Sequence, residues 1–106
     1  MASPFFMADL HLIPANEGGI ANSLPSDFCT VTLVTDNLEL TADLHYRGSP
    51  ESGSKFRVSV QPIPGNLIKR IDMDCQFAIY QEKKLIGYGL PLPNKTPRFR
   101  LVKPRA

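Results

Sequence analysis

The feature that most constrains this chain is an alternation of apolar and polar residues with a period of two. The alternation is clearest in residues 54–61, where Phe56, Val58 and Val60 are separated by charged and polar side chains. A second run covers residues 38–46 and carries an apolar or aromatic residue at every even position. Alternation of this kind is typical of β-strands that bury one face.

Four further segments are predicted to be strands. Residues 28–34 are rich in β-branched side chains, and we expect them to be covered on both faces. Leucines alternate with polar residues around residues 9–12, and the last two strands are expected at about 75–80 and 85–90. Residues 67–73 have a mixed, partly helical pattern, but we expect an extended segment that crosses the fold.

Proline, glycine, asparagine and aspartate collect between these runs, where they supply turn geometry. Six short strands separated by such turns indicate a sandwich or a barrel, and a barrel leaves no exposed strand edges. We therefore predict an all-β fold, a six-stranded antiparallel closed β-barrel. Gly87 and Gly89 lie two residues apart in the last strand and indicate a barrel corner or the close approach of another backbone.

The chain has 106 residues, which suits one domain with one core. We divide it into an N-terminal extension (1–7), a β-barrel domain (8–92) and a basic C-terminal tail (93–106). The extension ends in an apolar run, residues 5–7, which is expected to cover a face of the barrel or to add a strand, unless Met7 is the true first residue. No apolar run reaches the roughly 20 residues of a membrane span and no secretory signal pattern is present, so a cytoplasmic location is expected.

The net charge of +2 hides an asymmetry between tail and body. The tail carries five basic residues and no acidic residue, whereas residues 1–92 carry seven basic and ten acidic side chains. In the tail, Arg98, Arg100 and Lys103 lie near Phe99, a combination that lets cations meet phosphates while the ring stacks on a base. Non-specific RNA contact through the tail is therefore one expectation.

Two separated motifs resemble a known family. The first is a strand that leads into Glu17-Gly18-Gly19, and the second is a hairpin that begins with Phe77-Ala78-Ile79 and ends in Gly87-Tyr88-Gly89. In this order and at about this separation they resemble the C-terminal β-barrel domain of bacterial elongation factor Tu. Weaker similarity in residues 52–60 and 71–74 extends the resemblance over roughly residues 8–92.

The resemblance implies a six-stranded antiparallel barrel that binds aminoacyl-tRNA along one side and packs on a GTPase domain along another. The chain itself has no phosphate-binding loop of the Gly-x-x-x-x-Gly-Lys-[Ser/Thr] type, so GTP hydrolysis by that route is excluded. It also departs from the family at two places. The family carries Arg-His-Thr after the Glu-Gly-Gly, where residues 20–22 read Ile-Ala-Asn here, and it carries Glu-Gly-Gly-Arg where residues 81–84 read Gln-Glu-Lys-Lys. A carboxylate at Glu82 repels phosphate, and Lys84 keeps the charge of arginine but loses its planar fork.

Candidate catalytic and metal-binding residues are few. His11 and His45 fall on polar strand positions beside Asp9 and Asp43, so the two pairs could hold a metal if their strands were neighbours, although solvent-facing histidines are the simpler interpretation. The carboxylates at positions 72 and 74 are interpreted as a solvated acidic patch, with a cation site as the alternative.

The two cysteines, Cys29 and Cys75, fit no zinc spacing. Because both lie in apolar strand patterns, both are expected to be buried, with a disulfide or a reactive thiol as the alternative.

We therefore predict a non-catalytic binding module with no cofactor, whose partner is a protein or a ribonucleoprotein in or near translation. Two alternatives stay open: an antagonist or immunity-type protein that mimics a translation-factor surface, and a metal-dependent enzyme that uses His11 and His45. The predicted binding residues lie in the first loop, the last hairpin turn and the tail: Glu17, Gly18, Gly19, Gln81, Glu82, Lys83, Lys84, Arg98, Arg100 and Lys103.

Overall fold

A computed structural model describes residues 4–20 and 23–92 of the chain. This part contains strands and short 3₁₀ helices in the following order: β1 (Phe6–Leu12), η1 (Ala15–Glu17), β2 (Phe28–Val34), β3 (Glu39–His45), β4 (Lys55–Ile63), η2 (Gly65–Arg70), β5 (Phe77–Gln81) and β6 (Lys84–Pro91). The predicted strand segments are confirmed to within two or three residues at their ends.

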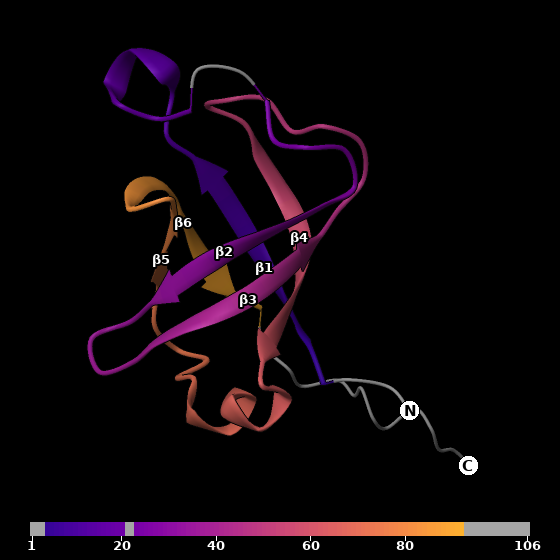
Figure 1. The fold of residues 1–106 in the computed structure, drawn as a ribbon, viewed down its shortest axis with the longest axis vertical. Helices are drawn as coiled ribbons and strands as arrows, with labels where there is room; N and C mark the ends of the chain where they lie inside the picture. Colours follow the sequence, from indigo (N-terminus) through magenta and orange to yellow (C-terminus); the bar gives the residue numbers. More distant parts are fainter. Residues whose placement is uncertain (1–3, 21–22, 93–106) are drawn as a thin grey trace.

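The six strands form a closed barrel in the spatial order β1-β4-β3-β2-β5-β6, and every neighbouring pair is antiparallel. The ladder between β1 and β6 closes the barrel, with Leu10 opposite Gly89 and Leu12 opposite Gly87. Figure 1 shows β2 and β3 crossing in front of β1 and β4 at a steep angle. The predicted fold class, an all-β closed barrel of six antiparallel strands, is confirmed.

The core consists of the inward-facing residues of all six strands. In β1 every second residue from Phe6 to Leu12 is buried, and in β3 the even positions predicted to face inward are buried as well. The expectation that residues 28–34 are covered on both faces is wrong. Only Cys29, Val31 and Leu33 are buried there, because the barrel has a single interior and the alternate residues of β2 face outward. The β-branched residues on that outer face therefore reflect strand propensity rather than burial.

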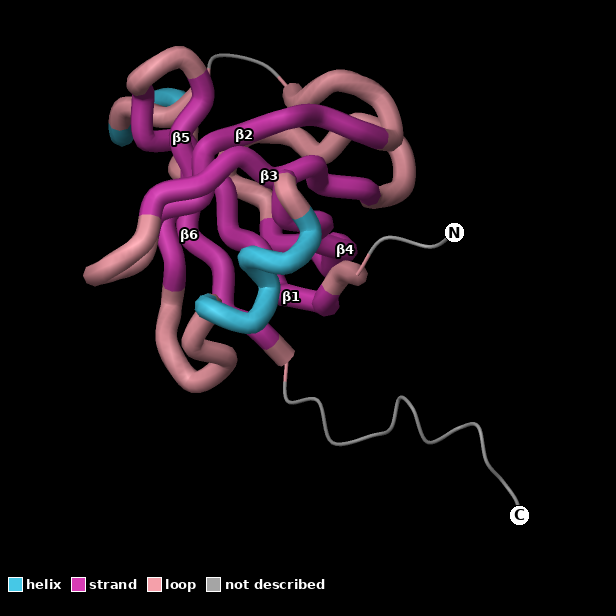
Figure 2. The backbone as a smooth tube through the Cα atoms, turned by 60° about the horizontal axis from the view of Figure 1, so that its bottom comes forward, coloured by secondary structure: helices cyan, strands magenta, loops and turns pink. Residues whose placement is uncertain are grey.

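Residues 65–70 form the 3₁₀ helix η2, so the extended crossing expected over residues 67–73 is wrong. The helix lies across one end of the barrel (Figure 2), where Leu67 and Ile68 pack against the core together with the buried Ile71. Leu67, Ile68 and Ile71 lie at spacings of one, three and four residues, which fits a helical turn. This turn brings all three side chains onto the open end of the barrel. A straight segment would have exposed at least one of them.

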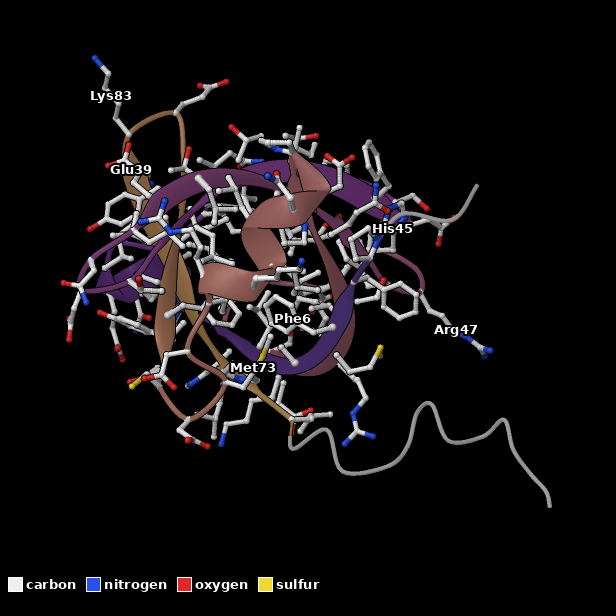
Figure 3. The ribbon with its side chains drawn as sticks, turned by 90° about the horizontal axis from the view of Figure 1, so that it is seen from below. Phe6, Glu39, His45, Arg47, Met73 and Lys83 are labelled. Atoms are coloured by element: carbon white, nitrogen blue, oxygen red, sulfur yellow. The ribbon has the colours of Figure 1, made fainter. Side chains whose placement is uncertain are left out.

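β1 begins at Phe6, so Phe6 and Met7 belong to the barrel wall and not to a separate extension. Phe6 pairs in register with Val60 and its ring packs edge-on against Phe77, with centroids 6.1 Å apart. Figure 3 looks into this end of the barrel and shows Phe6 at its centre, near Met73. The apolar run at the N-terminus thus supplies both core and strand.

The two glycines of β6 have different neighbours. A Cβ at Gly87 would lie 2.7 Å from the backbone oxygen of His11, which is the close backbone approach predicted from the sequence. A Cβ at Gly89 would lie 2.2 Å from Cζ of Phe77. Gly89 therefore makes room for a buried aromatic ring and not for a backbone.

The two ends of the barrel differ in what closes them. The loop after β1, the loop between β3 and β4 and the β5–β6 turn lie at one end, which we call the loop end. The other end, which we call the η2 end, holds the β2–β3 turn and η2. The last described residue, Leu92, also lies at the η2 end, where its amide donates a hydrogen bond to the Met7 carbonyl (2.9 Å). Figure 1 shows this arrangement along β1.

Candidate functional site

The Glu17-Gly18-Gly19 loop is a compact turn at the loop end. Gly18 ends η1 in the left-handed conformation (φ 97°), and the amide of Gly19 donates to the carbonyl of Pro14 (3.0 Å). A Cβ at Gly19 would overlap the backbone oxygen of Ile13. Both glycines are therefore required by the backbone, and the exposed carboxylate of Glu17 is the group that the loop offers to a partner.

The last hairpin turn has two central residues, because Gln81 and Lys84 form the final pair of the β5–β6 ladder. Glu82 and Lys83 both have positive φ, 52° and 71°, as a type I′ turn requires. Asparagine and glycine are the usual residues at these positions, so a Glu-Lys turn is strained. The side chains of Glu82, Lys83 and Lys84 are all exposed.

The structure brings this turn and the Glu-Gly-Gly loop to the same end of the barrel. Leu12 lies opposite Gly87 in the β1–β6 ladder, and the amide of Ile13 donates to the carbonyl of Ile86 (2.9 Å). The loop that follows Ile13 and the turn that precedes Ile86 therefore both begin where the β1–β6 ladder ends. Two of the three predicted groups of binding residues thus lie at the same end of the barrel, where they expose two carboxylates and two ammonium groups.

The third predicted group, Arg98, Arg100 and Lys103, lies outside the described residues. The described chain ends at Leu92, at the η2 end of the barrel and so opposite the loop end.

The two histidines are not brought together. His11 lies opposite Lys55 and His45 lies opposite Ser59, so β4 separates them and they are offset by four residues along it. This offset alone corresponds to about 13 Å, well beyond the reach of two ligands on one metal ion. Asp9 instead forms an ion pair with Arg57, at 3.2 Å between Oδ1 and Nε. Among the residues that the structure describes, no group of three or more His, Cys, Asp and Glu side chains could hold a metal ion.

Asp72 and Asp74 lie in a turn before β5 and not on a strand. Oδ1 of Asp72 accepts from the amide of Asp74 (2.9 Å) and Oδ2 accepts from the thiol of Cys75 (3.1 Å). The first of these bonds, and then the second, lower the pKa of the Asp72 carboxyl. The carboxylate is thus used to hold the turn together.

The expectation that both cysteines are buried holds for Cys29 and is wrong for Cys75, which is exposed. Its position just outside β5 explains the difference, because the apolar strand begins only at Phe77. Hydrogen bonding to Asp72, and then the nearby negative charge, raise the pKa of the Cys75 thiol. Burial raises the pKa of the Cys29 thiol. Both cysteines are free, so no disulfide links them.

The sequence analysis missed a groove at the corner between β3 and β4. Its volume is about 570 Å³, and its lining combines cationic, aromatic, apolar and hydroxyl side chains: Met7, His45, Tyr46, Arg47, Phe56, Arg57 and Ser59. The alternation pattern predicts which face of each strand points outward, but it gives no spatial order of strands. Arg47 and Arg57 therefore gave no signal of being neighbours across a groove.

Comparison with known proteins identifies no family for this chain. No protein-family model matches the chain. No curated protein is significantly similar to it. Within residues 4–20 and 23–92, no helix is long and apolar enough to cross a membrane.

Proposed function

We propose that the chain is a non-catalytic binding module that resembles the C-terminal barrel of elongation factor Tu and docks on a protein or ribonucleoprotein partner in or near translation. The observation that carries the proposal is that the Glu17-Gly18-Gly19 loop and the Gln81–Lys84 turn lie at the same end of a closed barrel. These are the two motifs on which the resemblance rests.

The backbone of the last turn supports the resemblance further. Glu82 and Lys83 stand where the family carries two glycines, and both adopt positive φ. Glycine takes that conformation at no steric cost, whereas glutamate and lysine do not. The turn thus has a conformation that two glycines would favour, which supports the proposed resemblance.

The chemistry of the loop end favours a protein contact over a bare phosphate contact. Glu17, Glu82, Lys83 and Lys84 are all exposed at this end, so it carries both signs of charge. Carboxylates repel a phosphate backbone, whereas mixed charges give register and selectivity in a protein interface. We expect RNA to be contacted by the basic tail and not by the loop end.

A pull-down from lysate at about 0.1 M salt, with and without nuclease, tests this proposal. The bait is the full chain, compared with a full-length variant that carries Arg98→Glu, Arg100→Glu and Lys103→Glu. The proposal expects enrichment of translation factors, ribosomal proteins or tRNA over a control bait. Capture of no component of translation by either bait would contradict it.

The second candidate function is a protein-only antagonist or immunity-type protein that mimics a translation-factor surface. Glu82 favours it, because a carboxylate at that position opposes RNA while it leaves protein docking intact. In the same pull-down it predicts a protein partner that resists nuclease and binds the tail variant equally well. Partner loss on nuclease treatment would exclude it.

A further inference from the structure

The groove between the end of β3 and the start of β4, which we call the corner groove, lies on the side of the barrel opposite the β5–β6 turn. Figure 3 shows His45 and Arg47 on one side of the barrel and Lys83 on the other. The inference drawn from it therefore does not rest on the function proposed for the loop end.

The corner groove exists because β3 leaves β4 early. The β3–β4 ladder ends with His45 opposite Ser59. Beyond this pair, the amide of Tyr46 donates to the carbonyl of Asp27 (3.2 Å), which turns the chain toward the segment before β2. β4 nevertheless continues to Lys55, and over these residues it pairs with β1.

Residues 55–58 of β4 thus form a short free strand edge. In the part of the chain that the structure describes, no strand pairs with them on the side that faces β3. A free edge of four residues matches the length over which an extended peptide adds to a sheet. Such addition recognises a polypeptide backbone, and an oligonucleotide cannot reproduce it.

The floor of the corner groove is aromatic. Tyr46 is buried and packs edge-on against the half-buried Phe56, with ring centroids 5.7 Å apart. The hydroxyl of Tyr46 donates to the carbonyl of Pro25 (2.7 Å), which fixes the ring in place. Met7, 38% exposed, adds a flexible apolar side chain from β1. The floor therefore suits apolar side chains of a ligand.

The rim of the corner groove is cationic. Arg47, Arg57 and His45 line it and are exposed. Arg57 is bonded to Asp9, but both side chains are more than half exposed, and an ion pair of this kind is worth less than about 1 kcal/mol, so it exchanges readily for another carboxylate.

Two carboxylates on neighbouring segments, Asp43 and Asp27, lie outside the lining of the groove and are held by hydrogen bonds. Asp43 accepts from the hydroxyl of Thr30 (2.7 Å), and Asp27 accepts from the amide of Gly48 (2.9 Å). Among the described residues that line the corner groove there are two arginines and no carboxylate, so the field at the rim favours anionic groups.

We propose that the corner groove binds an extended acidic segment of a protein partner, which adds to the free edge of β4 at residues 55–58. Apolar side chains of the segment lie on Tyr46 and Phe56, and its carboxylates pair with Arg47 and Arg57. Because successive side chains of a strand point to opposite sides, the expected ligand alternates acidic and apolar residues.

Selection from a displayed library of peptides of about twelve residues, with the full chain as target, tests this inference. Peptides are counter-selected on the R47E/R57E variant, and binding is then measured by fluorescence anisotropy at about 0.1 M salt. The matched control is K69E/R70E, which makes the same charge change on η2. A thermal melt of each variant shows that it is folded.

The inference expects enriched peptides to be acidic with alternating apolar residues, to lose roughly tenfold or more in affinity on R47E/R57E, and to bind K69E/R70E as they bind the unchanged protein. Binding is expected to shift the amide resonances of residues 56–58. Enrichment without an acidic bias, equal binding to both variants, or perturbation confined to residues 14–19 and 81–84 would each overturn it. So would single-stranded RNA of about twelve nucleotides that displaces the peptide and depends on the same arginines.

Discussion

Single residues decide how tightly this barrel closes, and Gly89 is the clearest case. The ring of Phe77, 2% exposed, occupies the space that a side chain at Gly89 would need, and the ring of Phe6 packs edge-on against it. A glycine in a strand interior usually weakens the strand, so its presence here is explained by the ring that it accommodates.

Gly89→Ala is expected to destabilise the protein by about 1–3 kcal/mol, because the new methyl group would overlap the Phe77 ring and force the ring to shift. Urea unfolding measures the free energy. Leu90→Ala is the control, since that neighbouring side chain is 52% exposed and its loss should stay within about 0.5 kcal/mol. Equal effects of the two substitutions would show that the packing described for Gly89 is wrong.

Cys75 offers a second test at the residue scale. It is the exposed thiol of the two, and the hydrogen bond to Asp72 raises its pKa, which lowers the thiolate fraction at mild alkaline pH. One thiol of the native protein is expected to react with a thiol-specific chromogenic disulfide, and Asp72→Asn is expected to speed that reaction several-fold. Asp74→Asn is the control, because it leaves the bond to the thiol intact and removes only the smallest of the charge effects on Cys75, so it should change the rate much less. A rate unchanged by Asp72→Asn would contradict this account of the thiol.

At the scale of elements, the strands were predictable and their neighbours were not. Alternation fixed the inward faces of β3 and β4, because one buried face imposes a period of two on any strand. The β3–β4 corner and the separation of His11 from His45 depend on the order of strands in the barrel, on which local sequence carries no information. The helix η2 was missed because a short 3₁₀ turn has too few residues to establish a period.

The β5–β6 hairpin is the element whose sequence fits its geometry least. Replacing Glu82 with asparagine and Lys83 with glycine supplies the usual pair of a type I′ turn and is expected to stabilise the protein by about 1 kcal/mol. Thermal or urea unfolding measures the change. Lys84→Gly, placed on a strand residue, should lower stability instead. A loss of stability in the Asn-Gly variant would mean that the turn is not type I′.

The whole molecule is a barrel with one buried core, and its stability should fall at high pH. Burial raises the pKa of the Tyr46 hydroxyl, and burial also raises the pKa of the Cys29 thiol. In the unfolded chain these groups ionise at about 10 and 8.5. The stabilisation that Tyr46 and Cys29 give the folded state is thus complete below about pH 8. It is lost as the pH rises through the pKa values of the unfolded chain toward the raised pKa values of the folded state.

Tyr46→Phe separates this effect from general alkaline denaturation. The variant loses the hydrogen bond to Pro25 and should be less stable by about 1 kcal/mol at pH 7. Since phenylalanine does not titrate, the stability of the variant should fall less between pH 8 and pH 10 than the stability of the unchanged protein. Unfolding in urea at several pH values checks both expectations, and parallel pH profiles would contradict the role assigned to Tyr46.

The loop end is the surface on which the proposed function depends, and quantitative mass spectrometry of captured proteins tests it most directly. Full-length protein is compared with K83E/K84E, which reverses two charges at the loop end, and with K69E/R70E, which makes the same change at the η2 end. The account predicts that components of translation are captured by the unchanged protein and by K69E/R70E, and are lost from K83E/K84E. Equal capture of those components by all three baits would contradict the claim that the loop end is the docking surface.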